Sequence, residues 1–386
     1  MKIIFISRPT FFTPMRERLF LKDELDKYEI EYWSTYYLYN KVNVYSYLEN
    51  SEEKIKTVIL RDKKELVKKI LEVDKEDIII TMEQINYANY NFFKKLYEKN
   101  IKIIFFYPEN IPGNYLYAGF YKNIMPYFSE LKDLKIFFQK AKNKIVKSIY
   151  RKRCLNLYKK MENITFLISG QIKEKEIIKN IKSKNNIIPI MSRDLLKYKE
   201  SEVREEKQII FIDQDLVNHP DLELKNEKGV KPSLYYKYLN DFFEKIEKKY
   251  RMNIVIAAHP SSRYIFNPFN NRKIIKNNTI NEIKRSKYIL GHYSTSLGVV
   301  TIEKKPLILI NMDIFSLRIK NYICCFGKEL GIIPVNLSSF NNVNIEFEKN
   351  EDFYEKYYKN YLYQGKEEIS IPINKILDIL NKKGLN

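Results

Sequence analysis

The stretch from Asn253 to Ser296 constrains the fold most, because it twice places a short apolar run directly before a polar turn. The two segments read NIVIAAHPSSRY and KYILGHYSTSLG. Apolar runs of this length are typical of buried parallel strands, and ligands of open α/β sheets bind outside the carboxyl ends of such strands. We therefore expect both turns to contact one ligand.

The rest of the chain alternates short apolar runs with amphipathic ones, which is the pattern of βαβ units and a parallel sheet. In the first half we expect strands at 2–7, 55–60, 77–81, 101–107, 164–170 and 186–192, and helices at 12–28, 62–71 and 87–99, with Asp62 as a helix N-cap. In the second half we expect strands at 208–213, 253–258, 287–291, 306–310 and 332–337, and helices at 234–250, 279–286, just after 296, 352–363 and 373–382.

The chain has 386 residues, which is long for a single hydrophobic core and favours two domains. A charged stretch at 197–207 has no periodic apolar positions, so it is the candidate linker. The predicted domains are 1–196 and 208–386. Two α/β, Rossmann-like domains of similar size that face a central cleft form the GT-B architecture, which is the predicted fold class. In this architecture we expect the first domain to bind an acceptor and the second to bind a nucleotide sugar.

The formal net charge of +20 predicts an acidic partner, such as a nucleic acid, an anionic membrane surface or a phosphorylated substrate. No nucleic-acid-binding motif accompanies the charge, so we expect no nucleic acid partner. Three cysteines are too few and too badly spaced for a disulfide framework or a thiolate metal site. Because the first apolar run is too short for a signal peptide and no run is long enough to span a bilayer, we expect a cytoplasmic protein.

Residues 131–161 form a basic stretch with apolar residues at helical spacing. Such a stretch can lie on the inner face of an anionic membrane, and it can equally be an ordinary solvated helix. The composition leaves both interpretations open.

The first polar turn contains His259, Pro260 and Ser261. An imidazole at the carboxyl end of a strand can donate a hydrogen bond or a proton to a departing phosphate, and the proline fixes the turn that aims it. The alternative is a histidine that only caps a helix start. The chain has three histidines, and two of them directly follow predicted strands, which favours the functional interpretation.

The second polar turn contains Tyr293, Ser294, Thr295 and Ser296. Its hydroxyls and the N–H groups of a following helix would form an anion site, although one serine that simply caps the helix is the alternative. The combination of this turn with the His-Pro turn predicts a phosphate site.

A third candidate segment is Asp213-Gln214-Asp215, at the end of the first strand of the second domain. It matches a metal-binding DxD pattern only weakly, and we expect no metal or other cofactor. The two carboxylates could instead serve as a general base, orient an acceptor or form a structural turn, and these alternatives stay open.

In the first domain, the turn PENIPGNY places Glu109 at a strand end and Gly113 where close backbone approach is needed. A carboxylate there could deprotonate an acceptor hydroxyl, and a solvated glutamate in a turn is the alternative. Glu83, after the strand DIIIT, is a weaker candidate.

The ordered set of PENIPG, AAHPSS and HYSTS resembles motifs of the bacterial sialyltransferases and polysialyltransferases that use CMP-activated nonulosonic acids. The set is also similar to the motifs of Kdo transferases. The resemblance implies a GT-B fold, with Glu109 as base, His259 and Pro260 on the CMP phosphate, and Ser294 and Ser296 on the donor. The acidic-acidic-Gly triplet of those families is absent, so Asp213 and Asp215 remain alternative bases.

The leading hypothesis is an inverting transferase that moves a sialic acid-like sugar from a CMP donor to a surface glycan or glycolipid acceptor. The alternatives are a Kdo transferase, a CDP-glycerol-type transferase of surface polymer synthesis, and a noncatalytic nucleotide-binding relative.

Overall fold

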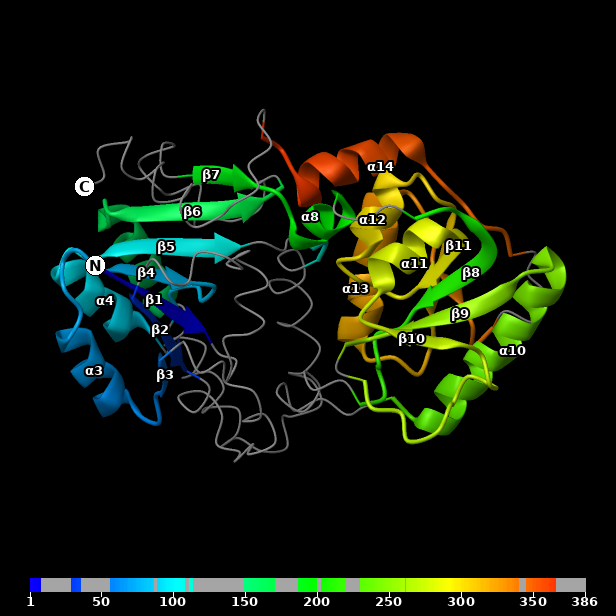
Figure 1. The fold of residues 1–386 in the computed structure, drawn as a ribbon, viewed down its shortest axis with the longest axis horizontal. Helices are drawn as coiled ribbons and strands as arrows, with labels where there is room; N and C mark the ends of the chain where they lie inside the picture. Colours follow the sequence, from blue (N-terminus) through cyan, green and yellow to red (C-terminus); the bar gives the residue numbers. More distant parts are fainter. Residues whose placement is uncertain are drawn as a thin grey trace. The chain divides into compact units, whose positions relative to one another are not determined.

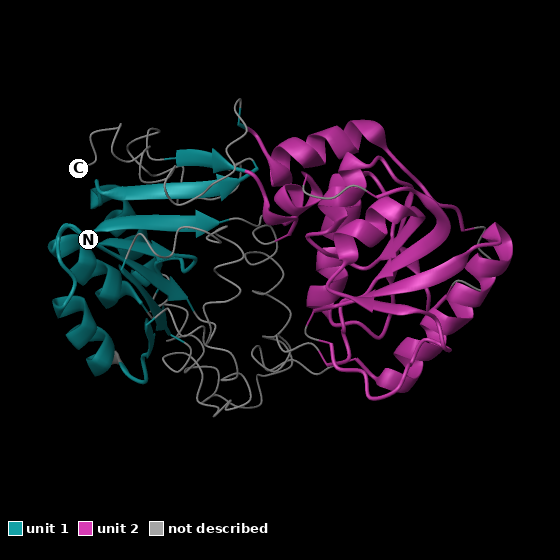
Figure 2. Ribbon diagram, viewed as in Figure 1, with its two compact units in different colours: residues 1–108, 120–190, 365–386 teal, residues 109–119, 191–364 magenta. Residues whose placement is uncertain are grey.

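The structure is a computed structural model, and it describes residues 1–7, 29–35, 56–86, 89–107, 111–113, 149–170, 187–199, 203–218, 230–260, 262–339 and 345–365. The chain divides into two compact units (Figure 2). Unit 1 comprises residues 1–108, 120–190 and 365–386, and unit 2 comprises residues 109–119 and 191–364. Each unit is built around a sheet of its own.

Unit 1 contains a parallel sheet of seven strands in the order β3-β2-β1-β4-β5-β6-β7 (Figure 1). The strands are β1 (Lys2–Ser7), β2 (Glu29–Ser34), β3 (Lys56–Ile59), β4 (Ile78–Thr81), β5 (Lys102–Tyr107), β6 (Ile164–Ser169) and β7 (Ile187–Ile190). The helices with described bounds are α3 (Lys63–Leu71) and α4 (Tyr90–Glu98). The order reverses between β1 and β4, as it does in a Rossmann fold.

The β2 strand was not predicted, because its alternating sequence EIEYWS carries two glutamates. One of them, Glu31, is buried, where it accepts hydrogen bonds from Trp33 Nε1 at 2.8 Å and from Lys56 Nζ at 2.6 Å. A buried carboxylate is tolerated when it is paired in this way. The predicted N-cap of α3 is confirmed, since Asp62 accepts from the N–H groups of Lys64 and Glu65.

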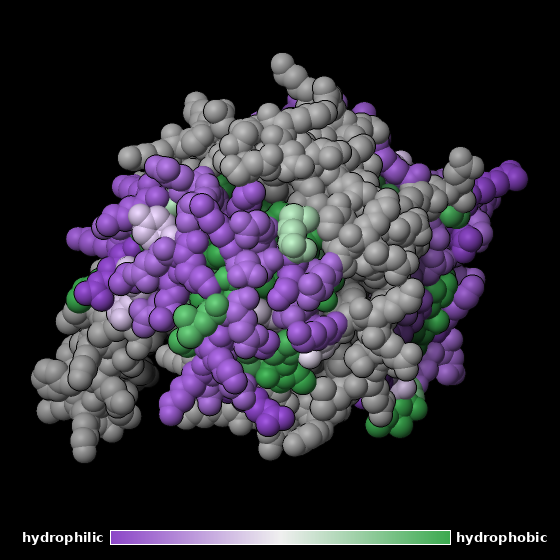
Figure 3. Space-filling model, turned by 60° about the vertical axis from the view of Figure 1, so that its left-hand side comes forward, coloured by the Kyte–Doolittle hydropathy of each residue, from purple (hydrophilic) through white to green (hydrophobic). Residues whose placement is uncertain are grey.

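The described part of the basic stretch is residues 149–161, of which 149–160 are helical. Most of its apolar side chains pack into the core of unit 1, whereas Ile149 is 48% exposed; the packed residues are Cys154, Leu157, Tyr158 and Met161. This apolar face therefore cannot be the one that enters a membrane. Residues 131–148 lie outside the described residues. Figure 3 shows one face of the molecule, where hydrophilic residues predominate and hydrophobic ones form small separate groups.

Unit 2 contains a parallel sheet of six strands in the order β10-β9-β8-β11-β12-β13. The strands are β8 (Glu206–Ile212), β9 (Asn253–Ala258), β10 (Ile274–Lys276), β11 (Ser286–Gly291), β12 (Leu307–Asn311) and β13 (Val335–Asn336). The helices are α8 (Arg193–Lys199), α10 (Pro232–Tyr250), α11 (Thr279–Arg285), α12 (Leu297–Ile302), α13 (Leu317–Leu330), α14 (Glu351–Tyr357) and the π-helix η5 (Tyr358–Leu362). This sheet also has the Rossmann strand order, with its reversal between β8 and β11.

The predicted α/β class, with two Rossmann-like domains of the GT-B kind, is confirmed by the two sheets. Three described elements of unit 2 were not predicted, namely α8, β10 and the long helix α13. The stretch at 197–207, which was expected to be a linker, contains the end of α8 and the start of β8. The helices predicted at 12–28 and 373–382 lie outside the described residues. Within the described residues, no helix is long and apolar enough to cross a membrane.

Helix α13 turns back sharply onto the segment that leads to β13. A Cβ added at Gly327 would lie 2.6 Å from the carbonyl oxygen of Ile332 and 3.0 Å from Pro334 Cδ. Backbone at this distance cannot move without displacing the strand. The glycine therefore sets how closely α13 approaches β13.

We expect Gly327→Ala to lower the free energy of unfolding of unit 2 by roughly 1–3 kcal/mol through overpacking. Gly298→Ala in α12 is the matched control, because its Cβ would meet Leu362 Cδ2, the end of a flexible side chain. Both variants gain the same helix propensity, so the difference between their urea denaturation midpoints isolates the clash. Equal midpoints would contradict the packing argument.

Candidate functional site

Three polar segments of unit 2 follow neighbouring parallel strands at the same edge of the sheet. β8 is central, with Ile212 paired to Ala257 of β9 on one side and to Gly291 of β11 on the other. The N–H group of Asp213 donates to the carbonyl of Ala257 at 3.0 Å, which continues the sheet beyond β8. The turns therefore share one edge, which contact with a single ligand would require. They also lie at the strand-order reversal, where open α/β sheets bind ligands.

Asp213 is almost fully buried at this edge, with 1% of its surface exposed. Its Oδ2 accepts a hydrogen bond from the hydroxyl of Tyr264, and the hydroxyl of Tyr235 lies 3.5 Å from Oδ1. Burial raises the pKa of Asp213 to about 6, the negative charge of Asp215 acts in the same direction, and the Tyr264 hydrogen bond opposes both. The carboxyl therefore titrates closer to neutral pH than an ordinary aspartate.

His292, which follows β11, is fully buried and does not reach a ligand from this edge. Its Nδ1 lies 2.8 Å from the carbonyl oxygen of Ile310, so Nδ1 carries the proton and donates it. Nε2 then accepts from the hydroxyl of Tyr235 at 2.9 Å. Burial lowers the pKa of His292 to about 4, which keeps the ring neutral. His292 thus orients Tyr235 over Asp213.

The other two members of the acidic segment differ in exposure. Asp215 is buried and adopts a left-handed backbone conformation with φ of 46°. Gln214 is half-buried, and its Nε2 lies 3.4 Å from the carbonyl oxygen of Asp213. Among the described residues, no group of three His, Cys, Asp or Glu side chains is placed to hold a metal ion.

The His-Pro turn is closed by a residue that the sequence did not single out. The carbonyl oxygen of His259 accepts hydrogen bonds from Ser262 N at 2.9 Å and from Ser262 Oγ at 2.7 Å. His259 itself is half-buried and Pro260 is exposed, so the imidazole is within reach of solvent. Ser261 lies outside the described residues.

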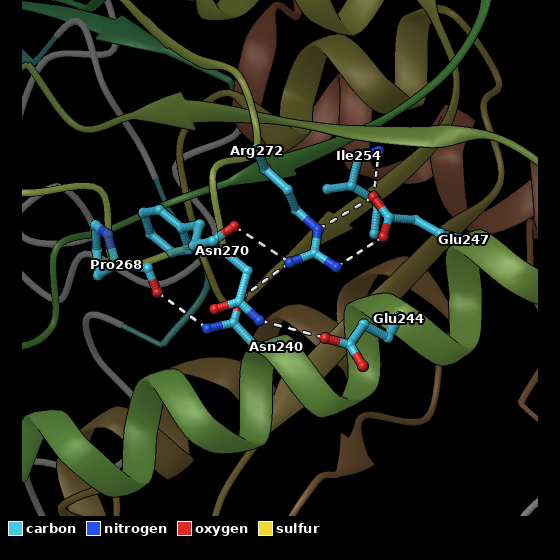
Figure 4. A network of polar contacts seen from close by, with 8 residues as sticks. Asn240, Glu244, Glu247, Ile254, Pro268, Asn270 and Arg272 are labelled. Atoms are coloured by element: carbon cyan, nitrogen blue, oxygen red, sulfur yellow. Dashed lines mark hydrogen bonds and ion pairs between the residues drawn. The ribbon is translucent and has the colours of Figure 1, made fainter.

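The crossover loop between β9 and β10, residues 262–273, is fixed to α10 by a network around Arg272 (Figure 4). Arg272 binds both carboxylate oxygens of Glu247, with Nε at 3.1 Å and Nη2 at 2.7 Å. Its Nη1 donates to Asn240 Oδ1 at 3.0 Å and to the carbonyl of Phe269 at 3.2 Å. Asn240 in turn donates from Nδ2 to the carbonyl of Pro268 at 3.0 Å.

This anchoring positions Tyr264. Phe269 is fully buried and packs edge-on against the Tyr264 ring, with centroids 5.6 Å apart. Phe269 also contacts the ring of Phe211 in β8. The packing of Phe269 therefore holds the Tyr264 ring in place, with its hydroxyl at Asp213.

The turn Tyr293–Ser296 is half-buried, and its backbone is largely engaged within itself. The N–H groups of Leu297, Gly298 and Val299 donate to the carbonyls of the residues three positions earlier, at 3.0–3.2 Å. The expectation that the first N–H groups of the following helix are available to an anion is therefore wrong for these three residues. These three N–H groups are therefore not donors to an anion, whereas the hydroxyls of the turn remain candidates.

Two side chains of this turn have defined contacts. The Ser294 hydroxyl accepts from the N–H of Ser296 at 3.2 Å, which closes the turn ahead of α12, whose N-cap Ser296 makes no side-chain capping hydrogen bond. The Tyr293 ring stacks on Tyr322 of α13, with centroids 5.4 Å apart and 21° between planes. The aromatic pair lies next to the turn that carries the hydroxyls of 294–296.

The described part of the PENIPG turn is residues 111–113, which group with unit 2 although they follow β5 of unit 1. Ile111 packs against the core of unit 2. Gly113 has φ of 88°, and a Cβ there would lie 3.1 Å from Cys325 Sγ and 3.3 Å from Tyr322 Cδ1. The glycine thus permits close approach to α13. Glu109 lies outside the described residues.

Unit 1 has a smaller polar cluster at the carboxyl edge of its own sheet. Glu83, after β4, is 9% exposed and accepts from the Thr35 hydroxyl and from Asn89 Nδ2, the latter at 3.3 Å. Thr35 also hydrogen-bonds through Oγ1 to the carbonyl of Ser7 at 3.2 Å. Glu83 is therefore held in place by neighbouring strand ends.

Four residues of the unit 2 edge escaped the sequence-based prediction, namely Tyr235, Ser262, Tyr264 and Arg272. Their types are common in any soluble chain, and only Ser262, the last residue of AAHPSS, lies within one of the motifs. Only the position of Tyr264 five residues after His259 offered a signal, since it lies on the loop that leaves the predicted turn.

Replacing Asp213 by Asn is expected to remove a pH dependence of stability. Because the pKa of Asp213 is about 6 in the folded chain against an ordinary 3.8, the folded state binds this proton more tightly. The stabilisation is complete below the ordinary pKa and is lost as pH rises to about 6. Asp213→Asn should lack this slope and should have the higher urea midpoint near neutral pH.

The control is Asp241→Asn, which changes an exposed carboxylate on α10 of the same unit. Urea midpoints measured across the acidic to neutral range should keep the wild-type slope in this variant. If Asp213→Asn also keeps it, the buried carboxyl is not the source of the pH dependence.

No family model matches the chain, and no curated protein is significantly similar to it. Solved structures similar to it include a UDP-GlcNAc 2-epimerase from Methanocaldococcus jannaschii, at 14% identity over 99% of each chain with a TM-score of 0.46. The wall teichoic acid polymerase TagF matches at 11% identity over 99% of this chain and 89% of the other, with a TM-score of 0.48. MurG of Acinetobacter baumannii matches at 8% identity over 88% and 86%, with a TM-score of 0.44. Such low similarity carries no argument about activity, so the fold assignment rests on the strand order of the two sheets.

Proposed function

We propose that this chain is a glycosyltransferase that binds a nucleotide-activated sugar at the carboxyl edge of unit 2. One observation carries the proposal: the segments that begin at Asp213, His259 and His292 surround the strand-order reversal of a Rossmann-like sheet. Half-buried side chains that can donate to a phosphate, His259 and the hydroxyls of 294–296, lie in these segments. A buried network of tyrosines, Asp213 and His292 supports them.

In the proposed reaction the acceptor hydroxyl loses its proton to a carboxylate while its oxygen forms a bond to the anomeric carbon of the donor sugar. The bond between that carbon and the nucleotide phosphate breaks, and the phosphate leaves with the electron pair. His259 and the hydroxyls of Ser294, Thr295 and Ser296 stabilise the charge on the leaving group. Tyr293, Gln214, Pro260 and Ser261 complete the donor contacts.

The proposed base is Glu109, which the motif resemblance implies. Asp213 and Asp215 were the alternatives, but each is at least 98% buried, which favours a supporting role in which they hold the edge rather than touch the acceptor. Asp213 would act by fixing Tyr264, and through it the loop that follows His259.

The donor in this proposal is a CMP-activated nonulosonic sugar, and the acceptor is a surface glycan or glycolipid. The motif set PENIPG, AAHPSS and HYSTS supports this choice over other nucleotide sugars. A CMP-sugar carries one phosphate as its leaving group, which a histidine and hydroxyls can neutralise with no metal ion. The +20 net charge also suits an anionic donor.

Nucleotide binding tests the donor class. We expect CMP to raise the melting temperature of the intact chain more than CDP, UDP or GDP does, because binding to the folded state alone stabilises it. The effect should survive a chelator. Stabilisation by UDP or GDP in place of CMP would overturn the donor assignment, and loss of the effect with chelator would point to a metal at Asp213 and Asp215.

The role of His259 is tested by His259→Ala with CMP-sialic acid as donor. We expect donor turnover to fall by roughly 10²–10⁴, the usual contribution of a positioned acid or charge-stabilising group. The melting temperature should change little, because the side chain is only half-buried. His292→Ala is the contrasting variant, and it should lower the melting temperature because that ring is buried and hydrogen-bonded at both nitrogens. Full turnover in His259→Ala would remove this residue from the mechanism.

A further inference from the structure

We propose that the tip of the crossover loop 262–273 docks unit 2 onto an anionic lipid bilayer, with Ile265 and Phe266 entering the interface. The proposal does not rest on the identity of the donor. It differs from the membrane interpretation of residues 131–161, where Cys154, Leu157, Tyr158 and Met161 are buried in unit 1.

The first observation is exposure. Ile265 is 98% exposed and Phe266 is 75% exposed, and the two are adjacent in the chain. Single exposed apolar residues are ordinary. Two large ones side by side at a loop tip expose a larger apolar surface to water, and a bound partner would cover that surface. An aliphatic and an aromatic side chain together are typical of segments that enter the interfacial region of a bilayer.

The second observation is that the tip stands on a rigid base. Arg272 and Asn240 fix the second half of the loop to α10, as described above. At the start of the loop, the Ser262 hydroxyl donates to the carbonyl of His259, and the carbonyl of Ser262 accepts from Lys276 Nζ at 2.8 Å. Asn267 also spans the loop, donating from Nδ2 to the carbonyl of Arg272 at 2.9 Å. A tip held in this way presents its apolar side chains at little entropic cost on binding.

The third observation is charge, which selects an anionic surface as the occupant. The segment from His259 to Lys276 contains Arg263, Arg272, Lys273 and Lys276 and has no Asp or Glu. Arg272 is paired with Glu247, whereas Arg263 and Lys273 are exposed beside the tip. Each basic residue near an anionic membrane adds to the attraction. Apolar side chains flanked by cations match the acyl and headgroup layers of such a membrane.

The loop also belongs to the candidate site, because Tyr264 precedes the tip and its hydroxyl reaches Asp213. Docking through Ile265 and Phe266 would therefore bring the carboxyl edge of unit 2 close to the bilayer surface. A membrane-borne acceptor is the class of substrate that such an arrangement serves.

The test is vesicle flotation of the full chain. Wild type should float with vesicles of equal parts phosphatidylcholine and phosphatidylglycerol and should bind pure phosphatidylcholine less. The double variant Ile265→Ser with Phe266→Ser should partition at least about tenfold more weakly, because it loses two large apolar side chains. Arg263→Glu should weaken binding more at low salt than at high salt.

The matched control is Leu317→Ser with Ile333→Ser, which removes two apolar residues of unit 2 that are 79% and 81% exposed elsewhere. All these side chains are exposed, so the variants should fold, and unchanged melting temperatures check this. The proposal is overturned if wild type does not float with the anionic vesicles, or if the tip variant binds them as wild type does. Self-association of wild type that the tip variant loses, with no vesicle binding, would assign the tip to a second copy of the chain instead. Since nucleotide binding is measured separately, failure here leaves the proposed function standing.

Discussion

The hydrogen bond between the Tyr264 hydroxyl and the buried carboxylate of Asp213 links the parts of unit 2 that the candidate site needs. Asp213 ends the central strand β8, and Tyr264 lies on the loop that leaves β9. Tyr235 and His292 add α10 and the end of β11 to the same network. Burial makes this carboxylate costly to ionise, and the hydrogen bond that Tyr264 donates to it offsets part of that cost.

Rigidity around that contact has a second source in the Arg272 network. A planar guanidinium that binds Glu247 and Asn240 of α10, and also the carbonyl of Phe269 on the loop, fixes direction as well as distance. Its effect extends in two directions along the loop, inward to Tyr264 and outward to the exposed tip. One anchored segment therefore connects the proposed donor site with the proposed membrane contact, which neither feature would indicate alone.

Unit 1 has the same strand organisation, with a smaller polar cluster at the carboxyl edge of its sheet. Its sheet also reverses strand order between β1 and β4, and a buried carboxylate, Glu83, is held there by Thr35 and Asn89. The similarity follows from topology, since parallel strands gather their carboxyl ends at one edge and expose polar turns there. The proposed base, Glu109, follows β5 of unit 1 in the chain but groups with unit 2, and residues 111–113 of the same turn pack on that unit.

The sequence by itself determined the α/β class, most of the strands and the edge at which His259 and Ser294 lie, because uninterrupted apolar runs that end in polar turns leave few alternatives to buried parallel strands. It missed β2, α8, β10 and α13, where charges or short length hide the periodicity. Tertiary structure decided which polar residues face solvent. His259 and His292 follow equivalent strands, yet only His292 is enclosed by Phe211, Phe315 and Tyr235. Burial and partnership depend on residues far apart in the chain, so no local pattern separates a histidine that can meet a ligand from one that supports the core.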